Sequence, residues 1–217
     1  MTTAIITGAS QGLGRAIATL LAQRRTKLVL NARHHEKLDE VARELSRFTH
    51  VTAVAGDVSE IAEEIAAAAP GADILINNAS ELGPLPMPQL DEYPWEALLR
   101  VFRVNVVAPI HLAQLVLPHM KARGSGVIVN ITSDAGVNAY PGWGGYGASK
   151  AALEHASRTL AAELEGTGVR VVAIDPGDMD TEMHRLAIPD ADVSQLARPE
   201  DVAPRIVALL EEEVAAA

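Results

Sequence analysis

Residues 7–14, with the sequence TGASQGLG, lie where the chain first changes from a strand pattern to a helix pattern. A β-branched run at 3–7 precedes them and an amphipathic pattern at 12–24 follows them, which predicts a strand, a tight turn and a helix. Glycine lets a backbone turn tightly and approach a ligand closely, and a helix N-terminus attracts an anion. The segment therefore predicts a turn that binds a phosphate group. A strand-to-helix turn without a ligand is the alternative interpretation.

Short β-branched runs alternate with longer helical patterns along the rest of the chain. Runs that are apolar on both faces are typical of strands in a parallel sheet covered on both sides, and the alternation indicates right-handed βαβ units. The expected strands are 3–7, 27–31, 51–55, 74–77, 127–131 and 169–174, and the expected helices are 12–24, 36–46, 61–69, 95–121, 147–164 and 199–212. We therefore expect one α/β domain over residues 1–217, with a doubly wound parallel sheet and helices on both of its faces.

The composition excludes other classes of protein. Eighteen basic and 28 acidic residues give a net charge of −10, so the chain lacks the basic surface of a nucleic-acid-binding protein. The absence of cysteine excludes disulfides, thiolate catalysis and zinc–sulfur sites. The seven histidines show no metal-ligand spacing, so we expect no metal.

The location follows from what the chain does not contain. No basic segment with an apolar stretch opens it, and no apolar run approaches the roughly 20 residues of a membrane helix. We therefore expect no membrane partner and a cytoplasmic protein.

The glycine spacing in the first turn is G-x-x-x-G-x-G, which resembles that of the short-chain dehydrogenase/reductase family. Further motifs follow in that family's order up to about Thr181: Asn77-Asn78-Ala79, Asn105, Ser133, Tyr146-x-x-x-Lys150, Pro176-Gly177 and Thr181. This resemblance implies a Rossmann-like sheet with strand order 3-2-1-4-5-6. It also implies an oxidoreductase that binds a nicotinamide dinucleotide.

The expected catalytic residues are Asn105, Ser133, Tyr146 and Lys150. Tyr146 and Lys150 are four residues apart on a predicted helix, so they share one face. A cation beside a tyrosine favours the phenolate and lowers a pKa that is ordinarily about 10. Tyr146 would then be the general acid or base, and Ser133 would donate a hydrogen bond to the substrate oxygen. The resemblance implies that Asn105 holds a water that relays protons toward Lys150; a structural polar residue in a helix is the alternative.

The end of the second strand bears on the choice of cofactor. It reads Leu30-Asn31-Ala32-Arg33, without the acidic residue that binds the ribose of NAD. A guanidinium pairs well with a phosphate, so Arg33 favours NADP(H) over NAD(H), although it could be an ordinary surface charge. The expected cofactor-binding residues are Gly8, Ser10, Gln11, Gly12, Leu13, Gly14, Arg33, Asp57, Val58, Asn78, Ala79, Tyr146, Lys150, Pro176, Gly177 and Thr181.

The chain departs from the family pattern in two places. Ser80 replaces the glycine expected after Ala79, and the chain stops at Ala217 without an obvious seventh strand. We expect a homodimer through the helices at 95–121 and 147–164, with a tetramer as the larger alternative. Residues 178–198 are interpreted as a flap on the substrate side or as an ordinary surface connection.

The leading hypothesis is an NADP(H)-dependent enzyme that reduces a carbonyl or oxidises a secondary alcohol. Apolar residues expected near the site suggest a fairly apolar small-molecule substrate: Leu82, Leu85, Trp143, Met179 and Met183. A non-catalytic dinucleotide-binding regulator on the same fold is the main alternative. A nucleotide-sugar epimerase is a third, although the segment after Pro176 leaves little room for the larger substrate domain that such an enzyme needs.

Overall fold

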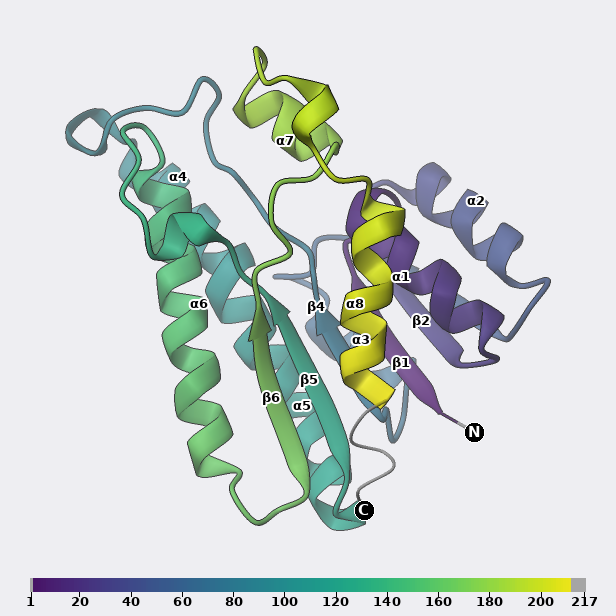
Figure 1. Cartoon of the computed structure of the whole chain (residues 1–217). Helices are drawn as coiled ribbons and strands as arrows, with labels where there is room; N and C mark the ends of the chain where they lie inside the picture. Colours follow the sequence, from purple (N-terminus) through teal and green to yellow (C-terminus); the bar gives the residue numbers. More distant parts are fainter. Residues whose placement is uncertain (1, 212–217) are drawn as a thin grey trace.

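Six parallel strands form the centre of the computed structural model, which describes residues 2–211 (Figure 1). They are β1 (Thr3–Thr7), β2 (Lys27–Ala32), β3 (Val51–Ala55), β4 (Ile74–Asn77), β5 (Gly126–Ile131) and β6 (Val169–Ile174). Their order is β3-β2-β1-β4-β5-β6, and every neighbouring pair is parallel, which confirms the predicted fold class. The carboxyl ends of all six strands therefore meet at one edge of the sheet.

Helices cover both faces of this sheet. They are α1 (Gly12–Gln23), α2 (His35–Leu45), α3 (Ala62–Ala67), α4 (Trp95–Phe102), α5 (Ala108–Arg123), α6 (Gly144–Glu163), α7 (Glu182–Ala187) and α8 (Pro199–Glu211), with the π-helical turn η2 (Arg103–Val107) and the 3₁₀ turns η1 (Leu90–Glu92), η3 (Asp134–Gly136) and η4 (Val193–Gln195). Helices α1, α2 and α8 pack on one face, and α3, α5 and α6 pack on the other.

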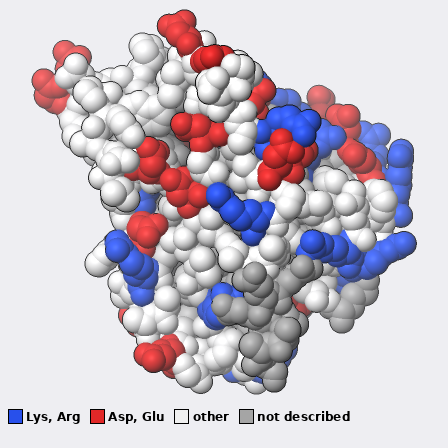
Figure 2. All heavy atoms as spheres, in the orientation of Figure 1, with Lys and Arg blue, Asp and Glu red and all other residues white. Residues whose placement is uncertain are grey.

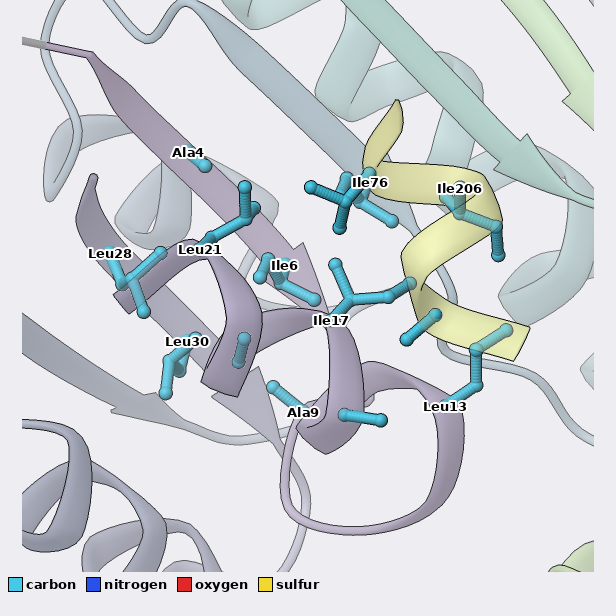
Figure 3. Packing of buried hydrophobic residues seen from close by; sticks show 14 of the residues in the cluster. Ala4, Ile6, Ala9, Leu13, Ile17, Leu21, Leu28, Leu30, Ile76 and Ile206 are labelled. Carbon is cyan, nitrogen blue, oxygen red and sulfur yellow. The ribbon is translucent and has the colours of Figure 1, made fainter. Parts of the chain in front are cut away.

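The sheet has an apolar core on each face because successive side chains of a strand point to opposite sides. Ile6 belongs to the core beneath α1 and α8, and its neighbour Ile5 belongs to the core beneath α3 and α5. Both isoleucines are completely buried. Figure 3 shows Ile17 of α1 lying between Ile6 of β1 and Ile206 of α8. This double burial explains why the strands read as continuous apolar runs.

The element boundaries differ most from the prediction in the helix expected at 95–121. The structure divides it into α4, the π turn η2 and α5, which runs on to Arg123. Pro109 has no N–H to donate to the carbonyl of Asn105, so the regular α-helical hydrogen-bond ladder is interrupted where the π turn η2 meets α5. The helix expected at 147–164 begins earlier, at Gly144, and the one expected at 61–69 is shorter. Residue 212, the predicted end of the last helix, lies outside the described residues.

The continuous helical stretch Trp95–Arg123 is long and apolar enough to cross a membrane by length and composition alone. The sequence analysis had found no apolar run of that length. More than half of the most apolar window, 56%, is buried inside the protein. Because its buried side chains, among them Leu112 and Met120, belong to the core on one face of the sheet, the stretch packs as a core helix.

The segment between β6 and α8 crosses the carboxyl edge of the sheet. Figure 1 shows α7 beyond the ends of the strands, on the edge toward which β5 and β6 point. Met179 pairs with Ala197 in a short parallel bridge, which closes this segment into a loop. An ion pair between Arg185 and Asp180 lies within the loop. The loop therefore stands over the edge at which ligands bind in open α/β sheets.

Candidate active site

A cleft of about 990 Å³ opens at the carboxyl edge of the sheet, beneath α7. Sixteen of the predicted site residues line it: Gly8, Ser10, Gln11, Gly12, Leu13, Arg33, Asp57, Val58, Asn78, Ala79, Ser133, Tyr146, Lys150, Pro176, Gly177 and Thr181. Gly14 and Asn105 are not among the lining residues. The motifs are far apart in the sequence, and the fold brings them together because each follows a strand that ends at this edge.

The glycine turn enters α1 with its backbone open to the cleft. Gln11 precedes the helix without a side-chain hydrogen bond that caps it, and the first N–H groups of a helix have no partner within the helix. Gly12 has a positive φ of 54°, which favours glycine. A Cβ on Gly14 would lie 2.4 Å from the carbonyl oxygen of Gly8, so Gly14 allows close packing behind the loop.

Thr7 joins the glycine turn to the turn after β4. Its Oγ1 accepts hydrogen bonds from the backbone N–H groups of Asn78 and Ala79, both at 3.0 Å. Asn78 returns two bonds, from Nδ2 to the carbonyl oxygens of Thr7 at 2.9 Å and Gly8 at 3.1 Å. The sequence analysis did not single out Thr7 as a site residue, although its place directly before the first glycine could have indicated it. These bonds fix the floor of the cleft.

Tyr146 and Lys150 lie one turn apart on α6 and are both buried, with 8% and 2% of their surfaces exposed. The Lys150 Nζ atom is 5.5 Å from the centre of the Tyr146 ring and donates a 2.8 Å hydrogen bond to the carbonyl oxygen of Ile131. Burial lowers the pKa of Lys150 to about 8, and the nearby Asp175 carboxylate partly opposes this shift. The sequence analysis missed Asp175, which lines the cleft directly before Pro176.

The pKa of Tyr146 differs from the sequence expectation. Burial raises it to about 12, and hydrogen bonding by the Ser133 and Ser80 hydroxyls offsets only part of that rise. The expectation that Lys150 lowers the pKa of Tyr146 was therefore wrong for the protein without a ligand. Removing a phenolate from water is more unfavourable than these hydrogen bonds are favourable. Tyr146 is a neutral phenol near pH 7, which is the form that can donate a proton.

Ser133 follows β5 and caps the N-terminus of the turn η3. Its Oγ accepts a hydrogen bond of 3.2 Å from the backbone N–H of Ala135 and donates one of 3.2 Å to Asp134 Oδ1. Tyr140 donates to the other carboxylate oxygen of Asp134 at 2.7 Å. The Ser133 hydroxyl is thus held beside the phenol of Tyr146 at the cleft wall.

The side chain of Asn105 has no hydrogen-bonding position left for a water. Its Nδ2 donates to the Glu81 carbonyl oxygen and to Ser149 Oγ, both at 2.9 Å. Its Oδ1 accepts from the Glu81 N–H at 2.8 Å and from Ser80 Oγ at 3.2 Å. A primary amide has two donor hydrogens and two acceptor sites, and all four are used here. Asn105 joins the loop after β4 to helix α6, so the predicted water relay does not run through its side-chain amide.

A group of alternating charges lies at the β2–β3 end of the cleft. Arg33 Nη1 is 2.9 Å from Glu81 Oε2, and Arg100 Nη2 is 3.6 Å from the same oxygen. Arg100 also pairs with Asp57, whose other oxygen accepts bonds from Ser59. These contacts lower the pKa of Asp57 although partial burial raises it. The sequence analysis missed Glu81 and Arg100, because no spacing rule relates them to Arg33.

The opposite end of the cleft is apolar around Tyr146. Leu82, Ala135 and Tyr146 form a small buried cluster, against which Met183 of α7 packs. Trp143 meets the Tyr146 ring edge to face, with 5.8 Å between the ring centres. The apolar residues expected near the site all line the cleft: Leu82, Leu85, Trp143, Met179 and Met183.

Comparisons with known proteins agree with this geometry. The family profile described as short chain dehydrogenase matches residues 2–192. The chain belongs to the short-chain dehydrogenase family. An uncharacterized oxidoreductase of Staphylococcus aureus is 36% identical to this short-chain dehydrogenase over 94% of this chain and 88% of its own. Sulfoacetaldehyde reductase 2 of Chromohalobacter salexigens is 36% identical over 82% of this chain and 73% of its own.

Solved structures show the same likeness. A structure described as a short chain dehydrogenase/reductase family protein has a TM-score of 0.87 and 31% identity, over 96% of this chain and 89% of that chain. A short-chain dehydrogenase of Shigella flexneri, crystallised with NADP, has a TM-score of 0.84 and 29% identity, over 96% of this chain and 90% of that chain. The short-chain dehydrogenase described here is therefore an oxidoreductase of the NAD(P)-binding family, with a small molecule as its substrate.

The residues present in this short-chain dehydrogenase fit such a dinucleotide. The uncapped N-terminus of α1 faces the cleft, and the close packing at Gly14 leaves the loop backbone accessible from the cleft side. Among the residues that the structure describes, no three His, Asp or Glu side chains are placed to hold a metal ion.

Proposed function

We propose that this protein is an NADP(H)-dependent oxidoreductase that reduces a carbonyl or oxidises a secondary alcohol, with Tyr146 as its general acid and base. One observation supports this most strongly. Tyr146 and Lys150 are buried together in the wall of a cleft whose other end is the glycine turn, and the Ser133 hydroxyl lies beside the phenol. This arrangement provides a proton donor, a cation and a hydrogen-bond donor around one point of the cleft.

The cofactor would lie along the carboxyl edge of the sheet. The backbone of residues 8–14 would hold its pyrophosphate, and Asp57 and Val58 would contact the adenine. Arg33 would bind the adenosine 2′-phosphate, since a guanidinium pairs strongly with phosphate oxygens. Asn78, Ala79, Pro176, Gly177 and Thr181 would line the path toward the nicotinamide, and Lys150 would hold its ribose. All of these residues line the same cleft except Ala9 and Gly14.

The chemistry divides between the bound cofactor and the chain. When bound, a nicotinamide cofactor would supply the hydride for reduction of the carbonyl, or accept it in oxidation of the alcohol. Tyr146 donates its phenolic proton to the carbonyl oxygen in reduction and takes a proton from the hydroxyl in oxidation. The single hydrogen of the Ser133 hydroxyl would turn from Asp134 Oδ1 to that oxygen as negative charge develops on it. Lys150 stabilises the phenolate that forms when Tyr146 gives up its proton, and solvent then replaces the proton.

The substrate end of the cleft favours an uncharged, fairly apolar carbonyl compound. Leu82, Trp143 and Met183 surround Tyr146, and the carboxylates of Asp134, Asp175 and Asp178 also line the cleft. Carboxylates repel an anion, so a negatively charged aldehyde, such as the one named for the Chromohalobacter relative, should be a poor substrate here. We infer that residues 178–198 form a flap, because α7 places Met183 against the Tyr146 cluster.

An exposed apolar surface on α4 and η2 suggests how the protein assembles. Trp95, Leu99 and Val107 on α4 and η2 are 65%, 60% and 57% exposed, an unusual exposure for apolar side chains along one helical stretch. They support a homodimer through α4, α5 and α6, in which this surface would be covered. We propose a cytoplasmic enzyme that binds neither nucleic acid nor membrane. Figure 2 shows acidic and basic side chains mixed on one face, without a continuous basic stripe.

The test is a panel of aldehydes, ketones and secondary alcohols, each offered with NADPH or NADP⁺ and with NADH or NAD⁺, and followed by nicotinamide absorbance. The panel includes neutral aromatic and aliphatic carbonyls and the anion sulfoacetaldehyde. We expect turnover of neutral carbonyls with NADPH, and weaker turnover with NADH. If no member reacts with either cofactor although both cofactors bind, the protein is a non-catalytic dinucleotide-binding regulator and the proposed activity is refuted.

A further inference from the structure

The pairing of Arg33 with Glu81 has a consequence for cofactor choice. We propose that Glu81 holds Arg33 in the place of an adenosine 2′-phosphate when no cofactor is bound, and thereby limits the preference of the protein for NADP(H) over NAD(H). This inference rests on the proposed cofactor site. Glu81 lies outside the motifs quoted in the sequence analysis.

Arg33 and Glu81 form an ion pair within the cleft. Arg33 follows β2 and Glu81 follows β4, so their 2.9 Å contact joins two walls of the cleft. The Glu81 side chain is 21% exposed and that of Arg33 is 54% exposed. The carboxylate therefore lies deeper than the guanidinium, which keeps access to solvent and to an incoming phosphate.

Glu81 is held in place through its backbone. Its backbone N–H and carbonyl oxygen both bond to the side chain of Asn105, at 2.8 and 2.9 Å. Asn105 in turn donates to Ser149 on α6, the helix that carries Tyr146. The backbone of Glu81 is thus fixed, and only its side chain needs to move when Arg33 takes another partner.

Glu81 has a second cationic neighbour, Arg100. Arg100 Nη2 lies 3.6 Å from the carboxylate oxygen that Arg33 contacts. Once a 2′-phosphate takes Arg33, Glu81 keeps this second cation, so the exchange does not leave an unpaired carboxylate. Lys37, a further cation near the glycine turn, is itself engaged, with Gln11 Oε1 at 3.2 Å and Glu182 at 3.6 Å.

The exchange discriminates between the two cofactors. A 2′-phosphate must displace Glu81 from Arg33 and tolerate a nearby carboxylate, whereas a ribose 2′-hydroxyl needs no release of Arg33. Glu81 therefore lowers the affinity for the phosphorylated adenosine selectively. Because the pair is partly exposed and screened by salt, the effect should be modest and should shrink at high ionic strength.

The experiment uses the full chain and two probes of the adenosine half alone: adenosine 2′,5′-bisphosphate and adenosine 5′-monophosphate. Affinities are measured by titration calorimetry for the wild type, Glu81→Gln and Glu36→Gln. Glu36 is an exposed carboxylate in the first turn of α2, so the control variant Glu36→Gln removes the same charge without freeing Arg33. We expect Glu81→Gln to bind the bisphosphate about three- to tenfold more tightly, with a change of less than about twofold for the monophosphate.

A bisphosphate affinity that is unchanged or weaker in Glu81→Gln overturns the role of Glu81 but leaves the proposed cofactor site intact, provided that the wild type binds the probe. If Glu81→Gln binds both probes more tightly by the same factor, the effect is one of general electrostatics and the role of Glu81 is overturned. The same holds if Glu36→Gln tightens bisphosphate binding as much as Glu81→Gln does. If neither probe binds to the wild type, the cofactor site itself is wrong.

Discussion

The Lys150 Nζ atom lies 5.5 Å from the centre of the Tyr146 ring, and burial shifts the two groups in opposite directions. It lowers the pKa of Lys150 to about 8 and raises that of Tyr146 to about 12. Both groups hold their protons at pH 7, so the protein without a ligand is prepared to donate a proton. This matches carbonyl reduction more directly than alcohol oxidation, in which Tyr146 must first lose its proton.

The buried ammonium of Lys150 should cost stability. Its pKa is about 8 in the folded protein, against an ordinary value of 10.5. Below pH 8 both states hold the proton and the cost is full. Between about pH 8 and 10.5 the unfolded state binds more protons, so stability rises with pH. We expect Lys150→Met to be more stable than the wild type below pH 8, by an amount on the order of 3 kcal/mol before the lost bond to Ile131 is subtracted, and the gap to close by pH 10.5.

This expectation is checked by urea unfolding of both proteins at pH 7, 8, 9 and 10. Lys27→Met, which removes an exposed ammonium at the start of β2, is the matched control. Its difference from the wild type should not narrow over this range. A constant difference for Lys150→Met would mean that burial does not lower the pKa of Lys150 in the folded protein.

Arg33→Asp should weaken NADPH binding by roughly tenfold or more, and NADH binding by less than about threefold, because only the former loses a charge-assisted bond to phosphate. Fluorescence titration with each cofactor measures this directly. Arg43→Asp makes the same charge change on the exposed side of α2, at an arginine whose Nε donates to the backbone oxygen of Asp39. Equal losses for both cofactors at position 33 would count against the 2′-phosphate contact.

Asn105→Ala should lower the free energy of unfolding by about 2 to 4 kcal/mol, because it removes four hydrogen bonds and leaves buried polar groups unpaired. Denaturant unfolding checks this against Gln23→Ala, an exposed substitution at the end of α1 that should change stability by less than about 0.5 kcal/mol. A loss of turnover without a loss of stability in Asn105→Ala would instead favour the proton-relay role predicted from the sequence.

Most strands could be predicted because parallel strands buried on both faces leave continuous apolar runs, whereas their order in the sheet followed from the resemblance to the short-chain dehydrogenase/reductase family. The break in the helix expected at 95–121 could not be predicted. In the sequence, a proline that interrupts a helix cannot be distinguished from one that a helix tolerates. The pairing of Arg33 with Glu81 joins residues 48 positions apart. Such a contact depends on where two loops meet in space. The pKa of Tyr146 was misjudged for a related reason: spacing places Lys150 beside it, but gives no measure of burial.

Single-turnover kinetics of Tyr146→Phe, with NADPH and the best neutral carbonyl from the panel, test the role of the phenol most directly. Phenylalanine keeps the ring and its packing against Trp143 and removes only the hydroxyl. We expect NADPH affinity to stay within about threefold of the wild type, and the rate of hydride transfer to fall by about a hundredfold or more. A rate within a few fold of the wild type would show that Tyr146 is not the proton donor.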